Sequence, residues 1–136
     1  MIELKILFEF VTLQRRLTES LLSLYPEFTE NKLLLGTPFK VELQVDTQMW
    51  DVSRHGVGVT FRRRNPEPNI VVDVHVDIKN PNRLDAWRLQ QYVESIGDAL
   101  TFSEAEMALR NGVEAGFLVA AEDGGYEPTK RFGEIS

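Results

Sequence analysis

The chain has 136 residues, enough to bury a hydrophobic core in one domain, and its 43% hydrophobic and 26% charged residues are typical of a soluble globular protein. It contains no cysteine, which excludes disulfides, thiolate chemistry and cysteine-based zinc sites. No uncharged run of about 18 residues could span a membrane, and no signal-peptide layout is present. We therefore expect a single cytoplasmic domain over residues 1–136.

The net charge of −6 is concentrated in the last third of the chain. Residues 1–90 carry 12 Lys and Arg against 12 Asp and Glu, whereas residues 91–136 carry 3 against 9. Such an acidic surface either simply keeps the protein in solution or attracts a basic partner, and it repels nucleic acid.

The first predicted element is a long amphipathic helix over residues 2–25, which Pro26 ends. Its apolar residues recur at spacings of three and four and share one face: Ile2, Ile6, Phe10, Leu13, Leu17, Leu21 and Leu24. The face is broad, which favours packing on a sheet over a coiled-coil dimer.

Alternating apolar and polar residues predict three strands, near 39–46, 57–64 and 72–78. Met49, Trp50 and Val52 are expected on a connecting segment after the first strand. The other two strands form a hairpin whose turn is Asn65–Asn69.

The register of this hairpin is constrained by its apolar residues. A connection of all five turn residues would place the two apolar sets on opposite faces, so the connection must have an even number of residues or a bulge. With the faces matched, Arg62 and Arg64 lie beside Asp73, His75 and Asp77.

Two helices and a second hairpin complete the chain. Asn80–Asn82 can cap a helix over 83–96 that ends at Gly97, and Ser103 with Glu106 predicts a capping box for a helix over 104–114. Residues 123–125 form the turn between strands 117–121 and 126–130. We predict an α+β fold: an antiparallel sheet of three or more strands, packed by the long N-terminal helix and the C-terminal helices, with a winged-helix-like terminal hairpin.

His55, Asp73 and His75 are the first candidates for a chemical site, because imidazole and carboxylate groups can hold a divalent cation or act as a general base. A metal needs three or four converging ligands, however, and the nearby arginines would satisfy the carboxylates. We therefore expect a salt-bridged sheet face without metal or cofactor. A small ligand- or metal-binding domain, or an enzyme using these residues, remains the alternative.

A winged-helix regulator is a second alternative. It would place helix 104–114 in the major groove of DNA and the hairpin against phosphate. Both elements are acidic, and phosphate contacts dominate the affinity for nucleic acid, so this alternative is disfavoured.

Three short motifs carry a resemblance: His55-Gly56 opening a strand, the alternating Val72-Asp73-Val74-His75, and Asp85-Ala86-Trp87-Arg88-Leu89 at a helix start. With them the chain resembles, over most of its length, a family of small uncharacterised bacterial domains. It departs from that family in a longer, proline-rich hairpin turn and in Arg83-Leu84, where Gly-Phe is expected. Asp85, Trp87 and Arg88 are expected to lock the sheet to the following helix.

Proteins of this kind are similar to the small immunity proteins encoded beside bacterial toxins. The resemblance and the charge together favour a non-enzymatic binding protein, an immunity protein whose acidic surface covers the active site of a toxin with a basic cleft. The candidate contact residues are acidic and lie in the last third of the chain: Glu104, Glu106, Glu122, Asp123 and Glu127.

Overall fold

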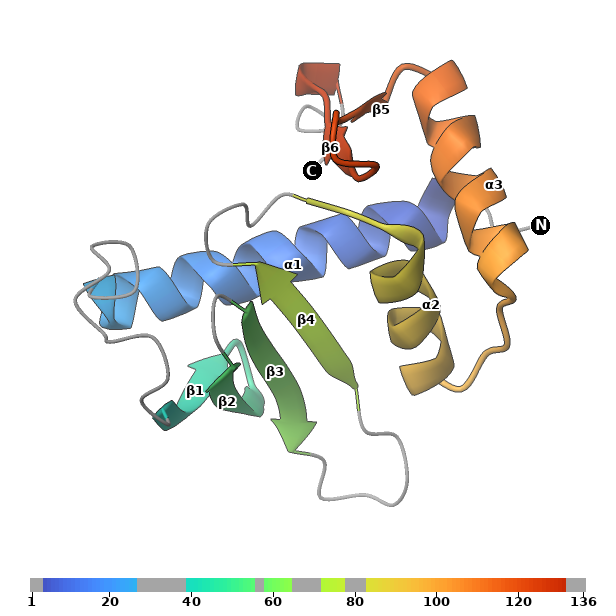
Figure 1. Cartoon of the computed structure of the whole chain (residues 1–136). Helices are drawn as coiled ribbons and strands as arrows, with labels where there is room; N and C mark the ends of the chain where they lie inside the picture. Colours follow the sequence, from blue (N-terminus) through green and yellow to red (C-terminus); the bar gives the residue numbers. More distant parts are fainter. Residues whose placement is uncertain (1–3, 27–38, 56–57, 65–71, 78–82, 132–136) are drawn as a thin grey trace. The chain divides into compact units, whose positions relative to one another are not determined.

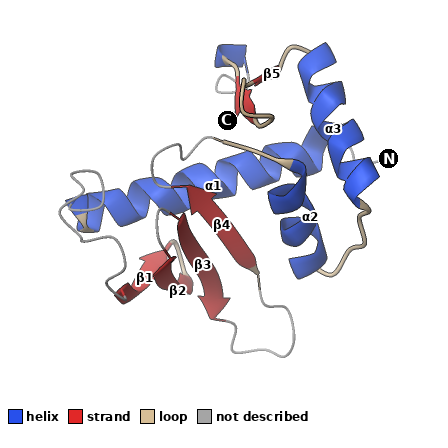
Figure 2. Ribbon diagram, viewed as in Figure 1, coloured by secondary structure: helices blue, strands red, loops and turns tan. Residues whose placement is uncertain are grey.

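The computed structural model describes residues 4–26, 39–55, 58–64, 72–77 and 83–131, and these have an α+β fold (Figures 1 and 2). They group into two compact units. The sheet unit comprises residues 14–26, 39–55, 58–64 and 72–77, and the terminal unit comprises residues 4–13 and 83–131. The predicted turn at 65–69 and the predicted cap at 80–82 lie outside the described residues.

Helix α1 (Leu4–Leu24) contributes residues to both units, and it confirms the long N-terminal helix. Its buried positions follow helical spacing: Leu7, Phe10, Gln14, Leu17 and Leu21. The predicted apolar stripe is therefore right in its central part, whereas Leu24, in the last turn, is 61% exposed. Within the described residues, no helix combines the length and the apolar character needed to cross a bilayer.

The sheet unit holds a four-stranded antiparallel sheet in the order β1 (Phe39–Val45), β2 (Gln48–His55), β3 (Gly58–Arg64) and β4 (Asp73–Asp77). Figure 1 shows the strands side by side in chain order. The expected connecting segment is wrong, because Met49, Trp50 and Val52 lie in β2. The alternation of β2 is obscured by Arg54, which occupies an inward position and is only 7% exposed.

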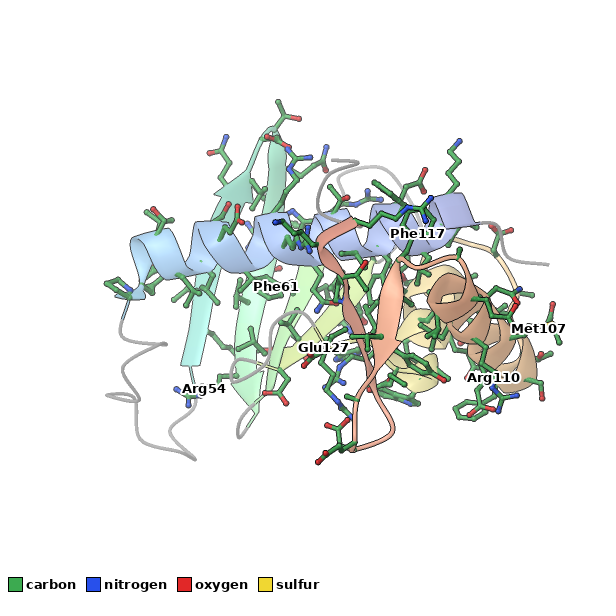
Figure 3. The ribbon with its side chains drawn as sticks, turned by 90° about the horizontal axis from the view of Figure 1, so that it is seen from above. Arg54, Phe61, Met107, Arg110, Phe117 and Glu127 are labelled. Atoms are coloured by element: carbon green, nitrogen blue, oxygen red, sulfur yellow. The ribbon has the colours of Figure 1, made fainter. Side chains whose placement is uncertain are left out.

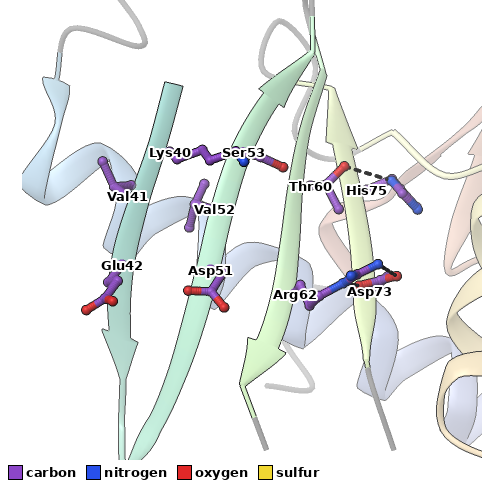
Figure 4. Close-up of a pocket in the computed structure, with 10 residues that line it drawn as sticks. All are labelled: Lys40, Val41, Glu42, Asp51, Val52, Ser53, Thr60, Arg62, Asp73 and His75. Carbon is purple, nitrogen blue, oxygen red and sulfur yellow. Dashed lines mark hydrogen bonds and ion pairs between the residues drawn. The ribbon is translucent and has the colours of Figure 1, made fainter. Parts of the chain in front are cut away.

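The pairing of β3 with β4 confirms the register argument. Phe61 pairs with Val74 and Arg62 with Asp73, so the connection has an even number of residues and the apolar sets share a face. That face is buried and contains Leu43, Val45, Trp50, Val52, Val59, Phe61, Val72, Val74 and Val76. Residues 14–24 of α1 lie on its side of the sheet (Figures 1 and 4). The described side chains of the opposite, polar face are half-buried or exposed.

A two-residue turn, Asp46-Thr47, joins β1 to β2. Asp46 adopts the left-handed conformation with φ of 56°, which a tight hairpin of this length requires and which aspartate tolerates better than most residues. Its carboxylate forms an ion pair with Arg16 of α1, so the turn is tied to the helix.

The terminal unit contains α2 (Ala86–Ser95), α3 (Phe102–Glu114) and a hairpin of β5 (Leu118–Ala120) and β6 (Tyr126–Pro128). Leu84 forms an isolated bridge with Tyr126, whose backbone groups exchange two hydrogen bonds of 2.8 Å with it. In chain order the unit has the first part of α1, the single-residue bridge of Leu84, two helices and a hairpin, which is the element order of a winged helix with its first strand reduced to one bridge. The predicted winged-helix-like hairpin is confirmed.

The core of the terminal unit is formed by residues 4–13 of helix α1 and by the elements after residue 83. Phe10 stacks on Tyr92 with ring centroids 4.7 Å apart. The other buried apolar residues are Leu7, Val11, Leu84, Ala86, Leu89, Val93, Leu100, Ala105, Ala108, Leu109 and Leu118.

The helix starts differ from those predicted. Helix α2 begins at Ala86 with Asp85 as its N-cap, and α3 begins at Phe102 with a capping box made by Thr101 and Glu104. The predicted capping box of Ser103 and Glu106 is therefore wrong by two residues. Thr101 also has a glutamate three positions later, and its backbone has the extended conformation of an N-cap. The predicted end of α2 is confirmed at Gly97, which has a φ of 94°.

Candidate functional site

The polar face of the sheet is the first candidate site. Strand pairing aligns its side chains in two rows, the first with Lys40, Ser53, Thr60 and His75 and the second with Glu42, Asp51, Arg62 and Asp73. All eight line a hollow of ≈ 850 Å³ on this face (Figure 4). This volume lies in the range of small-molecule sites.

The arginines of this face hold its carboxylates in place. Arg62 donates to Asp73 from Nε at 2.8 Å and from Nη2 at 3.0 Å, and these bonds raise the pKa of Arg62 above its usual value. Arg64 instead bonds Asp51 and Glu42, the latter at 2.8 Å, and its pKa is raised for the same reason. Of the predicted neighbours of Arg62, Asp73 is confirmed, whereas His75 and Asp77 pair with Thr60 and Gly58. Arg64 reaches across to β1 and β2.

The predicted His and Asp group is not assembled into a metal site in the described structure. His75 Nδ1 lies 3.1 Å from Thr60 Oγ1, and Asp73 is held by Arg62. His55 ends β2, and its side chain lies outside the described residues. Among the side chains that the structure describes, no three His, Asp or Glu groups lie close enough to hold a metal ion.

The outward face of α3 is the second candidate site, and it contains Ser103, Glu104, Met107, Arg110 and Glu114. Figure 3 shows Met107 on the side of α3 turned away from the hairpin. Met107 is 56% exposed. Glu106 lies at the edge of this face, 3.9 Å from Arg110. The result is an exposed apolar side chain among carboxylates.

Two of the five predicted contact residues also have structural roles. Glu104 accepts a hydrogen bond from the Thr101 amide, and its bonds to Thr101 lower the pKa of Glu104 below its ordinary 4.5. Asp123 accepts a 2.9 Å bond from the Gly125 amide and lies 3.1 Å from Arg83 Nε. The Gly125 bond first, and then Arg83, lower the pKa of Asp123 below 3.8.

The other predicted hairpin residues lie on either side of this turn. Glu122 is exposed, and Glu127 lies on β6 opposite Val119, which is 51% exposed. The structure thus places the five acidic residues on two elements of the terminal unit. It brings Asp123 to Arg83 and not to α3.

The motif at the start of α2 is built around Asp85. This carboxylate accepts from the Arg88 amide at 2.8 Å, pairs with the Arg88 guanidinium and lies 3.3 Å from Arg83. Arg83 in turn reaches Asp123, so these contacts connect the helix cap to the hairpin turn. Sequence reasoning missed this connection, although Arg83 was visible as a departure from the family pattern. Trp87 is 49% exposed on α2.

A family model for a domain of unknown function (DUF6896) matches residues 3–128. No curated protein and no solved structure matches the chain.

Proposed function

The chain belongs to the family described as a domain of unknown function (DUF6896), and we propose that it is a non-enzymatic binding protein, specifically an immunity protein that neutralises a bacterial toxin by covering the toxin's active site. The toxin would carry a basic cleft, and the two proteins would meet in the cytoplasm. The contact surface of the chain is the outward face of α3 together with the acidic residues of the β5–β6 hairpin.

The observation that supports this proposal is that arginines of the terminal unit are paired with groups of the same unit. Arg83 and Arg88 are engaged by Asp85. Arg131 donates to the Ala115 carbonyl at 2.8 Å and lies 4.6 Å from the centre of the Phe117 ring. These cations are therefore occupied within the unit, and the acidic excess faces solvent.

Several carboxylates of this unit have no partner among the described residues, namely Glu94, Asp98, Glu114 and Glu122. A surface of this kind attracts a basic partner over several ångströms and raises the rate of association at low salt. The same field opposes the binding of nucleic acid, since phosphate contacts would have to be made by Arg110 and Lys130 against surrounding carboxylates.

Met107 is the apolar side chain of this surface that could contribute binding affinity in addition to the charges. A single exposed apolar side chain is ordinary, but one at the centre of a helix face with a polar rim matches the organisation of protein interfaces, in which a buried apolar anchor contributes affinity. Because like charges would oppose each other in a pair of identical acidic surfaces, this organisation favours a basic partner over a second copy of the chain.

Co-expression with a toxin tests the proposal. The probe is the protein encoded directly upstream of this chain, produced from an inducible promoter in a sensitive bacterial host, with growth as the measurement. We expect the wild-type chain to restore growth and the double variant Glu114→Lys with Glu122→Lys to fail. Glu9→Lys with Glu19→Lys makes the same change in net charge at exposed positions of α1 and serves as the matched control. Unrestored growth with the wild-type chain would contradict the proposal.

A further inference from the structure

We propose that the hollow on the polar face of the sheet binds a short zwitterionic ligand, of the class of dipeptides, whose opposite charges lie about 7 Å apart. The hollow belongs to the sheet unit, and ligand binding there does not depend on the immunity function proposed for the terminal unit. It rests on the charges that remain after the ion pairs of this face are counted.

The second row of the hollow has an excess of negative charge. Asp73 is matched by Arg62, which gives it two hydrogen bonds. Glu42 and Asp51 share a single cation, Arg64. Two arginines thus serve three carboxylates, so one carboxylate charge of this row is not matched by an arginine.

The first row has the complementary excess. Lys40 is the one charged residue lining the hollow for which the structure shows no partner within its described part. It is exposed, and in Figure 4 its side chain extends over β2 toward Ser53. An ammonium group in this position can donate three hydrogen bonds to an incoming carboxylate.

Hydroxyl groups continue the row from Lys40 toward β4. Ser53 and Thr60 are adjacent across β2 and β3, and both are half-buried. Thr60 is oriented by its 3.1 Å contact with His75 Nδ1. A carboxylate bound at Lys40 would thus lie beside polar groups that the sheet holds in fixed positions, which reduces the cost of ordering them.

The spacing of the two rows determines how far apart the opposite charges of the ligand must lie. Lys40 and Glu42 are two residues apart on β1 and point to the same face, so the rows are about 6.8 Å apart. The charges of an α-amino acid are attached to one carbon atom and cannot span this distance. A dipeptide inserts one peptide unit, with its ~3.8 Å between Cα atoms, and can.

The lining argues against other classes of ligand. Apart from the imidazole of His75, the described lining residues contain no ring on which a base or a sugar could stack. The residue pairs of Arg62 with Asp73 and of Arg64 with Asp51 would also have to break before these carboxylates could hold a metal.

The experiment is a titration of the full ¹⁵N-labelled chain with Ala-Ala, followed by amide chemical shifts. We expect saturable shifts at Ser53, Thr60 and His75. We expect weaker binding by at least about tenfold for N-acetyl-Ala-Ala, for Ala-Ala amide and for glycine, because each lacks one charge or the required spacing. Absence of saturable shifts with Ala-Ala, or equal binding by a singly charged peptide, would overturn the proposal.

Two variants localise the site. Lys40→Met should weaken Ala-Ala binding by about tenfold or more, because it removes a charge-assisted hydrogen bond. Lys130→Met removes an exposed lysine of the terminal unit and should leave the affinity unchanged. Equal affinity in the wild-type chain and Lys40→Met would overturn the assignment. Because the ligand series uses the wild-type chain, it remains decisive even if a variant fails to fold.

Discussion

Arg62 and Asp73 form a two-pronged hydrogen-bonded ion pair across β3 and β4, with Nε to Oδ1 at 2.8 Å and Nη2 to Oδ2 at 3.0 Å. The pair lies on the solvent side of the sheet, where Arg62 is 60% exposed. Its energy is therefore limited by screening, although its geometry is that of the strongest arginine–carboxylate contacts.

A double-mutant cycle measures this pair. We expect Arg62→Met and Asp73→Asn to show a coupling free energy of about 0.5–1 kcal/mol in urea unfolding, reduced at high salt. Glu106 and Arg110 are 3.9 Å apart on α3 and serve as the weak reference, with an expected coupling of about 0.3 kcal/mol. Equal coupling in the two pairs would contradict the importance of the two-pronged geometry.

The start of α3 gives a second prediction, because two overlapping capping boxes are possible in its sequence. Thr101→Ala should lower the free energy of unfolding by about 1 kcal/mol, since it removes the acceptor for the Glu104 amide at 3.1 Å. Ser103→Ala lies within the helix and should change stability by no more than about 0.5 kcal/mol. Thermal or urea unfolding of the two variants distinguishes the Thr101 capping box from the Ser103 capping box. A larger loss of stability in Ser103→Ala than in Thr101→Ala would contradict the observed cap.

Gly112 gives a third prediction. Alanine normally stabilises a helix interior relative to glycine by about 1 kcal/mol. Here a Cβ atom would lie 2.7 Å from Leu118 Cδ1 and 3.2 Å from Leu7 Cδ2, both of buried side chains. We therefore expect Gly112→Ala to destabilise the protein by about 1–2 kcal/mol in urea unfolding.

A compensating change is the control for this packing argument. Leu118→Val shortens the side chain that the new Cβ would meet, so the loss caused by Gly112→Ala should be smaller in the Leu118→Val background. A Gly112→Ala variant more stable than the wild-type chain would show that helix propensity, rather than close packing, decides at this position.

A fourth prediction concerns the acid limb of the stability curve, the pH range in which the free energy of unfolding falls as the pH falls. The folded-state pKa values of Glu104 and Asp123 lie below their ordinary values of 4.5 and 3.8. The stability that these carboxylates contribute is thus fully present above those ordinary values and is lost as the pH falls through the lower folded-state values. Glu104→Gln and Asp123→Asn each remove one of these carboxylates, so each should reduce the slope of the free energy of unfolding against pH in the acid limb.

The measurement is the free energy of urea unfolding from neutral pH into the acid range. Glu94→Gln removes an exposed carboxylate of α2 that has no hydrogen bond in the described structure, and it serves as the matched variant. An acid limb of unchanged slope in both Glu104→Gln and Asp123→Asn would contradict the structural roles assigned to these groups.

Local patterns were sufficient to predict most elements of the fold. Helix α1, strand β1, the hairpin of β3 and β4, and the terminal hairpin all follow from periodicity and turn residues. The even number of residues in the β3–β4 connection followed from the requirement that the apolar residues of both strands lie on one buried face. Strand β2 was missed because Arg54 interrupts its apolar side, and only tertiary burial accounts for an arginine there.

Long-range pairings could not be predicted in the same way. Arg64 joins Asp51 and Glu42 from two other strands, and Arg83 reaches Asp123 across forty positions of the chain. The choice between the Thr101 and Ser103 boxes is likewise made by where the backbone becomes extended. The acidic contact residues followed from charge counting, but the structural roles of Glu104 and Asp123 required coordinates.

The rate of association with the upstream-encoded toxin, measured by stopped-flow fluorescence over a range of salt concentrations, tests the central proposal most directly. Electrostatic steering predicts a fast rate that falls with salt, and a marked decrease in Glu114→Lys with Glu122→Lys but not in Glu9→Lys with Glu19→Lys. Equal rates in the two double variants, or a rate independent of salt, would contradict an acidic contact surface on the terminal unit.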